Sequence, residues 1–237
     1  MFDFLSKNTS DDKYRHEYKY VIDRIQYEEL KIRLPGVLDV DKHTINGIYN
    51  IRSLYFDDYA DSYYYDNLNG NEPREKFRIR IYNGSLDVIK LELKIKRHGK
   101  TLKKSCGISP ELAKTLSQGK PIAYSDDLDP LLKKFYILQE TRFLQPKVIV
   151  EYDRIPYICQ DGNVRVTLDL DIRSSSDLEK FLEKEIHARP VMPNGQNILE
   201  VKFDEFLPDY IHNSLQLKKL QQTTFSKYFL CRNLPYR

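Results

Sequence analysis

The sequence predicts an α+β domain built on a closed antiparallel barrel of eight strands, with helices around it. Several segments alternate charged and apolar residues, which is the period of a strand with two different faces. Turn sequences such as Asn83-Gly84 join consecutive strand candidates, as in antiparallel hairpins. Helical stretches lie between the strands and near the end of the chain, a pattern typical of a decorated barrel. The 237 residues suffice for one domain at residues 14–237, after a flexible N-terminal arm at residues 1–13.

The strand candidates follow from alternation and from the turns between them. In chain order they cover residues 14–22, 49–56, 75–82, 87–97, 100–108, 147–159, 163–172 and 197–203. Most of the connections are short, so strands that follow each other along the chain are expected to pair antiparallel. The three candidates between residues 75 and 108 therefore form a meander.

Helices are expected between the strands and after the last one. Their ranges are 26–34, 57–68 as a short helix or turn, a helix that begins at 110, then 128–138, 208–220 and 223–230. The helix at 110 has the clearest start, because Ser109 suits the N-cap, Pro110 the first position and Glu111 the first turn. Pro35-Gly36 ends the first helix.

The charged faces of the strands are mostly basic. They carry Arg15, Glu17 and Lys19; Lys76, Arg78 and Arg80; Lys90, Glu92, Lys94 and Lys96; Tyr152 and Arg154; Arg165, Thr167 and Asp169; and Glu200 and Lys202. In a closed barrel these faces would line a common interior. Arginine forks and mobile lysine charges suit a polyanion with many phosphates. The alternative is a set of solvated faces with cross-strand charge pairs, which are common in antiparallel sheets.

Three carboxylates stand on these otherwise basic faces, namely Glu17, Glu92 and Glu200. Carboxylates among cations favour a Mg²⁺ or Mn²⁺ ion that bridges protein and phosphate oxygens. Glu200 is the best candidate for a metal ligand. The alternative is that each carboxylate merely offsets the positive charge of its neighbours.

Composition and motifs argue against several other classes. The 38 Lys and Arg against 35 Asp and Glu leave a net charge of +3, which does not favour nucleic-acid binding. No apolar run approaches the roughly 20 residues that cross a bilayer, and no signal peptide is visible, so we expect a cytoplasmic protein. The three Cys lack the spacing of a disulfide framework or a zinc site. Nucleotide P-loop, dinucleotide-binding, zinc-protease and nucleophile-elbow motifs do not occur.

Eight short motifs occur in a specific order along nearly the whole chain, from Arg15 to Tyr228. They are RHEYKYVI at 15–22, SLYFDD at 53–58, KFRIRIY at 76–82, LELKIK at 91–96, EYDRIPY at 151–157, RVTLDLDI at 165–172, ILEVKF at 198–203 and FSKY at 225–228. This series resembles the vacuolar transporter chaperone (VTC) domain, the polyphosphate polymerase branch of the triphosphate tunnel metalloenzyme (CYTH-like) superfamily.

The resemblance implies a triphosphate tunnel with a C-terminal capping helix. It also implies a polyphosphate polymerase that transfers the γ-phosphate of ATP to a growing chain, with Mn²⁺ or Mg²⁺ as cofactor and Glu200 as the metal ligand. Together with the basic faces, the phosphate-binding candidates are Arg15, Lys19, Lys76, Arg78, Arg80, Lys94, Lys96, Lys103, Tyr152, Arg154, Arg165, Lys202, Ser226 and Lys227. Among these, Arg78, Arg80, Arg154 and Lys227 are the catalytic candidates, and Ser226 and Lys227 would cap the tunnel.

Two positions depart from the pattern of the superfamily. Arg15 stands where an ExExK motif would have its first Glu, which favours the polymerase branch, and Lys96 stands where some polymerases have His. Two other functions stay open, a metal-dependent nucleoside or inorganic triphosphatase and a non-catalytic polyphosphate-binding domain. The expected partners are ATP, inorganic phosphate and polyphosphate but no nucleic acid. Delivery of the product across a membrane would need a membrane-protein partner.

Overall fold

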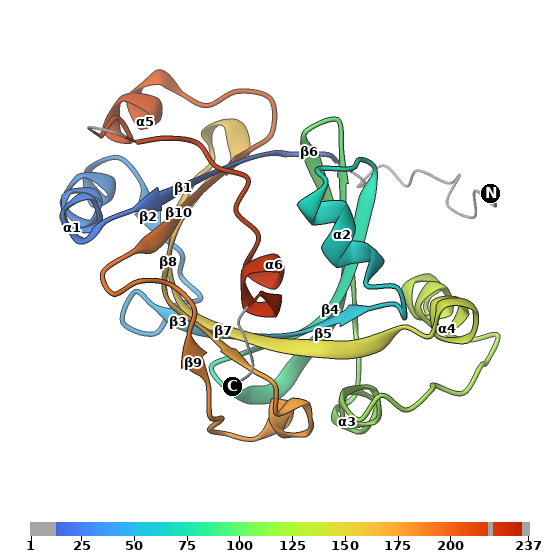
Figure 1. Cartoon of the computed structure of the whole chain (residues 1–237). Coiled ribbons are helices and arrows are strands. Elements are labelled where there is room, and N and C mark those ends of the chain that lie inside the picture. The colour runs from blue at the N-terminus through green and yellow to red at the C-terminus, as the bar shows by residue number, and fades with distance from the viewer. Residues whose placement is uncertain (1–12, 218–219, 234–237) are drawn as a thin grey trace.

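A curled antiparallel sheet forms the centre of the molecule, which a computed structural model describes at residues 13–217 and 220–233 (Figure 1). Eight strands follow in the order β1-β10-β8-β7-β3-β4-β5-β6, and every neighbouring pair is antiparallel. They are β1 (His16–Ile22), β3 (Tyr49–Asp57), β4 (Arg74–Tyr82), β5 (Ser85–Arg97), β6 (Lys100–Gly107), β7 (Gln145–Cys159), β8 (Val164–Ser175) and β10 (Asn197–Phe203). Two short strands, β2 (Asp39–Val40) and β9 (Arg189–Pro190), pair with β7 and β8.

The first and last strands of this order meet, so the sheet closes into a barrel. Arg15, just before β1, and Thr101 in β6 exchange both backbone hydrogen bonds at 2.9 Å. The Thr101 hydroxyl also donates to the Glu17 carboxylate at 2.9 Å. Closure satisfies backbone groups that an open sheet would leave at its edges. The predicted eight-stranded closed barrel is confirmed.

Turn chemistry sets the β4–β5 hairpin. Asn83 and Gly84 have φ angles of 51° and 63°, and two successive residues at positive φ match the twist of the flanking strands. A residue with a bulky or branched side chain would be strained at either position. The Asn83-Gly84 turn therefore fixes which residues of β4 and β5 lie opposite each other.

The barrel carries its apolar residues on the outside. Phe77 and Leu93 on β4 and β5 are fully buried, and the ring of Phe77 meets that of Phe135 from a covering helix edge-on, with ring centroids 5.2 Å apart. A second apolar cluster, which includes Leu30 and Leu199, covers the opposite side of the barrel. Each such side chain contributes roughly 1.5–3 kcal/mol when it is fully buried. Two cores outside the barrel thus leave the inner face of the strands free for polar side chains.

The helices are short and mostly peripheral. They are α1 (Arg24–Arg33), α2 (Ser62–Leu68), α3 (Pro110–Ser117), α4 (Pro130–Arg142), α5 (Asp209–Ser214) and α6 (Lys227–Arg232), with 3-10 turns η1 (Leu34–Gly36), η2 (Asp161–Asn163) and η3 (Leu178–Leu182). The predicted start of α3 is confirmed, because Ser109 accepts a hydrogen bond from the backbone N–H of Leu112 at 3.2 Å. Asp23 and Gln26 form a reciprocal capping box at the start of α1.

The last two helices differ from expectation. The helix expected at 223–230 begins only at Lys227, because the preceding residues run beside β1 instead. The N–H of Thr223 donates to the carbonyl of Lys19 at 2.8 Å, and β-branched Thr223 and Thr224 suit an extended backbone. The helix expected at 208–220 ends at Ser214, and residues 218–219 lie outside the described residues, as do residues 1–12 of the expected arm.

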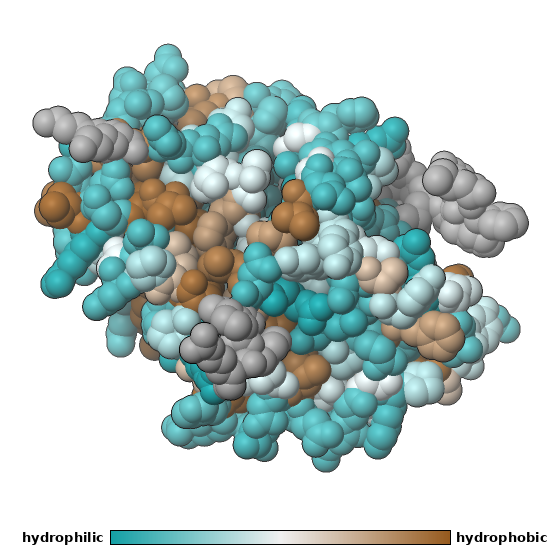
Figure 2. Space-filling view, viewed as in Figure 1, coloured by the Kyte–Doolittle hydropathy of each residue, from teal (hydrophilic) through white to brown (hydrophobic). Residues whose placement is uncertain are grey.

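Helix α6 lies within the ring of strands in Figure 1 and caps the barrel, as predicted. Its Ser226 N-cap accepts a hydrogen bond from the N–H of Phe229 at 3.3 Å. On the face that Figure 2 shows, hydrophilic residues predominate and apolar residues gather near α1. Across the described ranges, no helix has both the length and the apolar character needed to span a bilayer.

Candidate functional site

Three cavities follow one another along the inside of the barrel. Their order is visible along β4, where Arg74 and Lys76 line the first cavity, Lys76 to Arg80 the second and Arg78 to Tyr82 the third. The two outer cavities measure about 310 and 430 Å³, and the middle one only about 60 Å³. The barrel interior is therefore a passage with two wide mouths and a narrow centre.

The structure brings the predicted cations together in this passage. The middle cavity is lined by Lys19, Lys76, Arg78, Arg80, Lys94, Arg154, Lys202 and Lys227, together with Tyr152 and Ser226. Arg15, Lys103 and Arg165 line the larger mouth, and Lys96 lines the other mouth. All of the predicted phosphate-binding residues thus line the three cavities inside the barrel, which the alternation in β1, β4, β5 and β10 had indicated.

Glu92 is the centre of one ion-pair cluster in the lumen. Its carboxylate is fully buried and accepts a hydrogen bond from Arg78 at 2.7 Å. Lys103 lies 3.3 Å and Arg80 3.8 Å away. Burial alone would raise the pKa of Glu92, but Arg78, Arg80 and Lys103 outweigh it and hold the pKa well below its usual range. Glu92 is therefore ionised and orients the guanidinium of Arg78.

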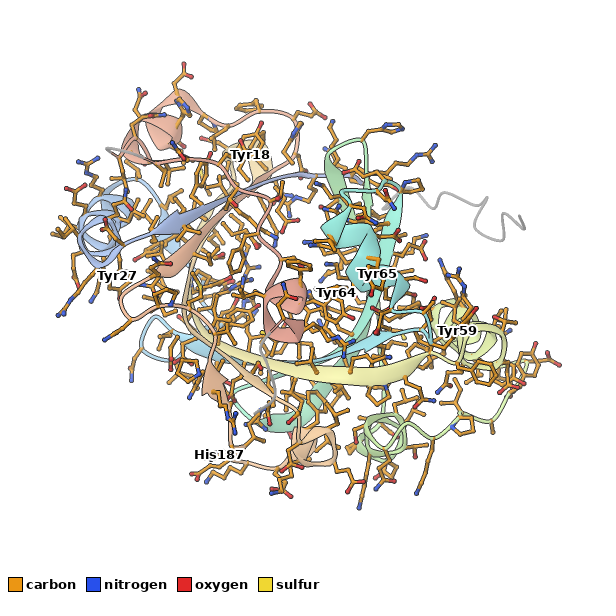
Figure 3. All side chains as sticks on the ribbon, in the orientation of Figure 1. Tyr18, Tyr27, Tyr59, Tyr64, Tyr65 and His187 are labelled. Atoms are coloured by element: carbon orange, nitrogen blue, oxygen red, sulfur yellow. The ribbon has the colours of Figure 1, made fainter. Side chains whose placement is uncertain are left out.

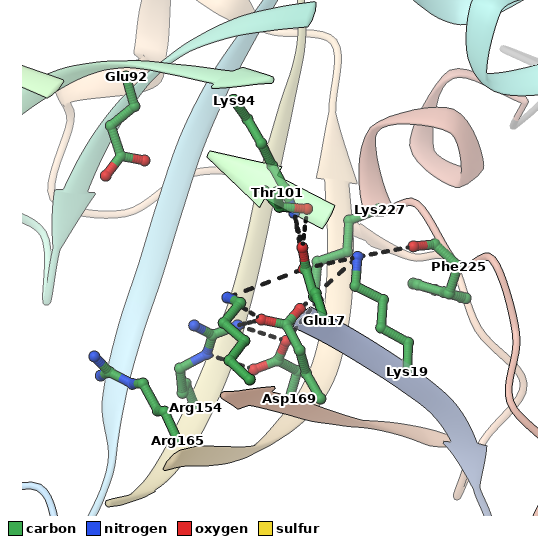
Figure 4. A network of polar contacts seen from close by, with 12 residues as sticks. Glu17, Lys19, Glu92, Lys94, Thr101, Arg154, Arg165, Asp169, Phe225 and Lys227 are labelled. Carbon is green, nitrogen blue, oxygen red and sulfur yellow. Dashed lines mark hydrogen bonds and ion pairs between the residues drawn. The ribbon is translucent and has the colours of Figure 1, made fainter. Parts of the chain in front are cut away.

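Glu17 is the centre of a second cluster, near the seam of the barrel (Figure 4). Lys94 donates to both of its oxygens at 2.6 and 2.7 Å, and Lys19 lies 3.2 Å away. Burial acts to raise the pKa of Glu17, but Lys19, Lys94 and Lys202 hold it well below the ordinary value. Lys19 also donates to the carbonyl of Phe225 at 3.0 Å, which links this cluster to the segment before α6.

Glu200 lies deeper, beside three cations. Lys202 is its nearest ion-pair partner, and Lys19 and Arg154 each lie 3.8 Å away. Burial acts to raise its pKa, but these cations outweigh both burial and the nearby carboxylate of Glu17, so the pKa lies well below the usual range. Lys202 makes its ion pair with the Oε1 atom of Glu200, whereas the hydroxyl of Thr167 forms no hydrogen bond with any described group. Thr167 is the direct cross-strand partner of Glu200.

Asp169 joins the barrel to its cap. It is fully buried and accepts two hydrogen bonds from Arg154 at 2.6 and 2.8 Å, in the fork geometry typical of a strong Arg–carboxylate pair. Lys227 of α6 donates to the same carboxylate at 2.5 Å, and its ammonium lies 4.7 Å from the ring centre of Tyr152. Arg154 and Asp169 are cross-strand partners, but both are buried and Arg154 lines the middle cavity, so the alternative of a solvated ladder of charge pairs does not hold here.

Lys76 has a different environment from the other lumen cations. Within the part of the chain that the structure describes, no carboxylate forms an ion pair with it. Its ammonium donates to the Ser226 hydroxyl at 3.2 Å and lies 5.8 Å from the ring of Tyr228. Burial, reinforced by the positive charges of Lys19, Arg74 and Arg78, lowers the pKa of Lys76 to about 7. An anion in the lumen would relieve this repulsion.

Several residues that hold the lumen cations were not predicted, namely two uncharged residues of β3 and an aspartate from the loop before it. Ser53 accepts a hydrogen bond from Arg80 at 3.1 Å, and the Tyr55 hydroxyl accepts one from Arg78 at 3.0 Å. Asp41 lies 2.9 Å from Arg165 at the larger mouth. The motif SLYFDD was noticed, but its tyrosine and serine look the same in sequence as those of any half-buried strand.

Glu200 and its neighbours offer too few oxygen ligands to hold Mg²⁺ or Mn²⁺ by themselves. They could hold such an ion if a bound phosphate supplied the remaining oxygen ligands. In the described ranges, no three His, Cys, Asp or Glu side chains gather closely enough to hold a metal ion by themselves. The hydroxyl of Thr167 is an oxygen donor without a hydrogen bond, and the Oε1 atom of Glu200, which pairs with Lys202, would exchange that ammonium for the metal ion. Mg²⁺ and Mn²⁺ are commonly held by one or two carboxylates plus phosphate oxygens, so the residues fit such an ion.

A closed antiparallel barrel with a cation-lined lumen and a capping helix is a triphosphate tunnel fold. The chain belongs to the VTC domain family, whose model matches residues 14–235. No curated protein matches the chain.

The solved structures to which the chain is similar are distant in sequence. HpAC1 from Hippeastrum, whose structure was described as revealing a dominant triphosphatase activity, is 14% identical with a TM-score of 0.50, and the match covers 92% of this chain and 95% of that one. The PH1012 protein from Pyrococcus horikoshii OT3 is 12% identical with a TM-score of 0.49, with 91% and 98% covered. At 14% identity the likeness to HpAC1 concerns the fold alone.

Proposed function

We propose that this protein is a polyphosphate polymerase, which transfers the γ-phosphate of ATP to a growing inorganic polyphosphate chain inside the tunnel. The observation that supports this function is the narrow middle of the lumen. There, cations from β1, β4, β5, β7 and β10 surround a narrow cavity that lies between two wider ones, and α6 adds Lys227. A passage of this kind suits a linear polyanion that must enter, react and move on.

The cations of the lumen pair with carboxylates of the protein and could also pair with phosphate oxygens of a ligand. In the empty tunnel, Glu17, Glu92, Asp169 and Glu200 hold many of the cations by ion pairs. The cations that line the middle cavity outnumber these carboxylates, so positive charge remains for phosphate oxygens. Charge-assisted hydrogen bonds contribute roughly 1.5–3 kcal/mol each, so a few of them would hold a triphosphate firmly.

Phosphoryl transfer needs positioning and charge stabilisation more than covalent help from the protein. The guanidinium groups of Arg78, Arg80 and Arg154 are held by hydrogen bonds to Glu92, Ser53 and Asp169, so their forks are already oriented. Lys227 enters from α6 as a point charge that Asp169 holds in place. We propose that these four side chains contact the transferring phosphate, with no covalent enzyme intermediate, and that phosphate or short polyphosphate is the acceptor.

Glu200 would hold Mn²⁺ or Mg²⁺ together with phosphate oxygens. Such an ion neutralises charge on the phosphate oxygens when it is bound. The protein groups contribute the rest: the carboxylate of Glu200 is kept ionised by Lys202, Lys19 and Arg154, so it is ready to bind a cation.

The proposal is tested by incubation of the purified protein with ATP and Mn²⁺. Products are resolved on a gel stained for polyphosphate, and free phosphate is assayed in parallel. The informative variant is Glu200→Gln. Its matched control is Glu151→Gln, because Glu151 is also a buried carboxylate that pairs with an arginine, Arg52 at 3.0 Å, but it lies outside the lumen cavities.

The expected result is long polyphosphate from the wild type and from Glu151→Gln, and none from Glu200→Gln. ADP with free phosphate but no polymer would contradict the polymerase and establish a triphosphatase. Absence of turnover, with tripolyphosphate binding that Glu200→Gln does not weaken, would instead leave a non-catalytic polyphosphate-binding domain.

A further inference from the structure

Asp57, at the end of β3, is a buried carboxylate that the proposed reaction does not use. It is fully buried and lies outside the linings of the three lumen cavities. Its oxygens accept hydrogen bonds from the backbone N–H groups of Asp58, Tyr63 and Tyr64 at 2.9, 2.9 and 3.0 Å. The fourth donor is the hydroxyl of Tyr228 at 2.5 Å, which comes from α6. One carboxylate therefore joins β3, α2 and the capping helix.

Tyr228 and Lys227 are adjacent in α6 and contact different parts of the molecule. Lys227 reaches Asp169 in the lumen at 2.5 Å, whereas Tyr228 reaches Asp57. The ring of Tyr228 also packs near Tyr55 of β3, with ring centres 5.3 Å apart. A change in the position of the Tyr228 side chain against Asp57 and Tyr55 must therefore move the backbone that carries Lys227.

Other contacts between α2 and α6 also hold α6 in this position. Tyr64, which Figure 3 shows between the two helices, stacks on Phe229 with ring centres 4.9 Å apart. Arg232 pairs with Asp61 at 2.9 Å. These contacts are partly exposed, whereas the Tyr228 hydroxyl and the Asp57 carboxylate are buried. A helix of six residues has little stability of its own, so its position depends on such tertiary contacts.

We propose that the hydrogen bond from Tyr228 to Asp57 seats α6 and thereby sets Lys227 in the lumen, which makes Asp57 and Tyr228 positioning residues for phosphoryl transfer. This inference rests on the proposed function for its kinetic consequence. It also assigns a role to Asp57 of the SLYFDD motif, which has no place among the lumen cations. Hydrogen bonds to a charged group contribute enough that loss of one shifts an equilibrium about tenfold or more.

The first test is kinetic and uses Tyr228→Phe, which removes the hydroxyl and keeps the ring. The matched control is Asp58→Asn. Asp58 is also a buried carboxylate that accepts backbone hydrogen bonds at the start of α2, from Ala60 and Ser62, but none of its contacts reaches α6. We expect kcat to fall about tenfold in Tyr228→Phe, with KM for ATP changed by less than about twofold, and kcat to stay near wild type in Asp58→Asn.

A positioning role and a general structural role differ in a double-variant measurement. If Tyr228 acts through Lys227, Tyr228→Phe should cause no further loss of kcat in a Lys227→Gln background. Equal losses in both backgrounds would overturn the inference, because the effect would then not pass through Lys227. Asp57→Asn serves as the second variant and should show the same dependence on Lys227.

The second test needs no catalytic activity, so it remains valid if the proposed function fails. Cys231 of α6 is fully buried, and burial raises the pKa of its thiol to about 12. Its alkylation by iodoacetamide under native conditions therefore reports the opening of α6. Peptide mass spectrometry separates it from the half-buried Cys106 and Cys159.

We expect Cys231 to be alkylated about tenfold faster in Tyr228→Phe than in the wild type or in Asp58→Asn, with Cys106 and Cys159 unchanged. Unchanged Cys231 reactivity would show that the hydrogen bond from Tyr228 to Asp57 does not hold α6 in place, and would overturn the inference. If the wild type makes no polymer but Tyr228→Phe exposes Cys231, the proposed function fails. The role of the Tyr228–Asp57 hydrogen bond in holding α6 would still be confirmed.

Discussion

Replacement of Lys76 by methionine should make the empty protein more stable at pH 6, although the same change should weaken phosphate binding. Lys76 is placed among Lys19, Arg74 and Arg78, and burial together with these charges lowers its pKa from 10.5 to about 7. The unfolded chain therefore holds the proton more tightly than the folded chain does. The cost to folding is fully present below pH 7 and disappears as the pH rises from about 7 to 10.5.

The size of this cost follows from the two pKa values of Lys76. A change from 10.5 to about 7 corresponds to at most about 5 kcal/mol, at 1.36 kcal/mol for each tenfold change in proton affinity. Lys76 keeps some contact with solvent, which screens the repulsion, so we expect Lys76→Met to gain about 2 kcal/mol at pH 6. For an m-value of about 2.5 kcal/mol/M, the urea midpoint would rise by about 0.8 M.

The assay is urea unfolding followed by circular dichroism at pH 6, 8 and 10. Lys134→Met serves as control, because Lys134 pairs with Glu75 at 2.6 Å outside the lumen cavities. The control should change stability by no more than about 1 kcal/mol. The gain in Lys76→Met should shrink toward pH 10. A gain that is absent at pH 6, or equal at pH 6 and pH 10, would refute the reasoning.

Two further predictions concern the buried carboxylates. Asp169→Asn removes the anion that holds Arg154 and Lys227, so it should destabilise the protein by about 3–5 kcal/mol. Added tripolyphosphate should restore much of the lost thermal stability. A thermal unfolding scan without such recovery would contradict the prediction. Glu92 has a pKa lowered in the folded state, so its stabilising effect is present above the ordinary value of 4.5 and is lost as the pH falls further. The stability deficit of Glu92→Gln should therefore be smaller at pH 3 than at pH 7, and equal deficits in denaturant titrations would contradict this assignment.

The strands and the charged lumen were predictable because each depends on local period. Alternation along β4 and β5 places Lys76, Arg78 and Lys94 on one face whatever the rest of the chain does. The hairpin at Asn83-Gly84 then sets their register. These local rules sufficed for the barrel and for the residues that line it.

The contacts that organise the lumen were not predictable in the same way. Asp169 and Lys227 are separated by 58 residues, and nothing in the sequence near either one indicates the other. The same holds for Asp57 and Tyr228, which are 171 residues apart. The start of α6 at Lys227 was missed because the pairing of residues 222–225 with β1 is a tertiary contact that overrides local helix preference.

The placement of both apolar cores outside the barrel separates folding from ligand chemistry. In a small barrel with an apolar interior, a change of one inner side chain alters the core that holds the fold together. Here Phe77 packs outward against Phe135, while its neighbours Lys76 and Arg78 face the lumen. Side chains in the lumen can therefore be exchanged with little effect on core packing. A fold of this kind offers a chamber whose specificity for anions can be redesigned, or can diverge among relatives, on an unchanged scaffold.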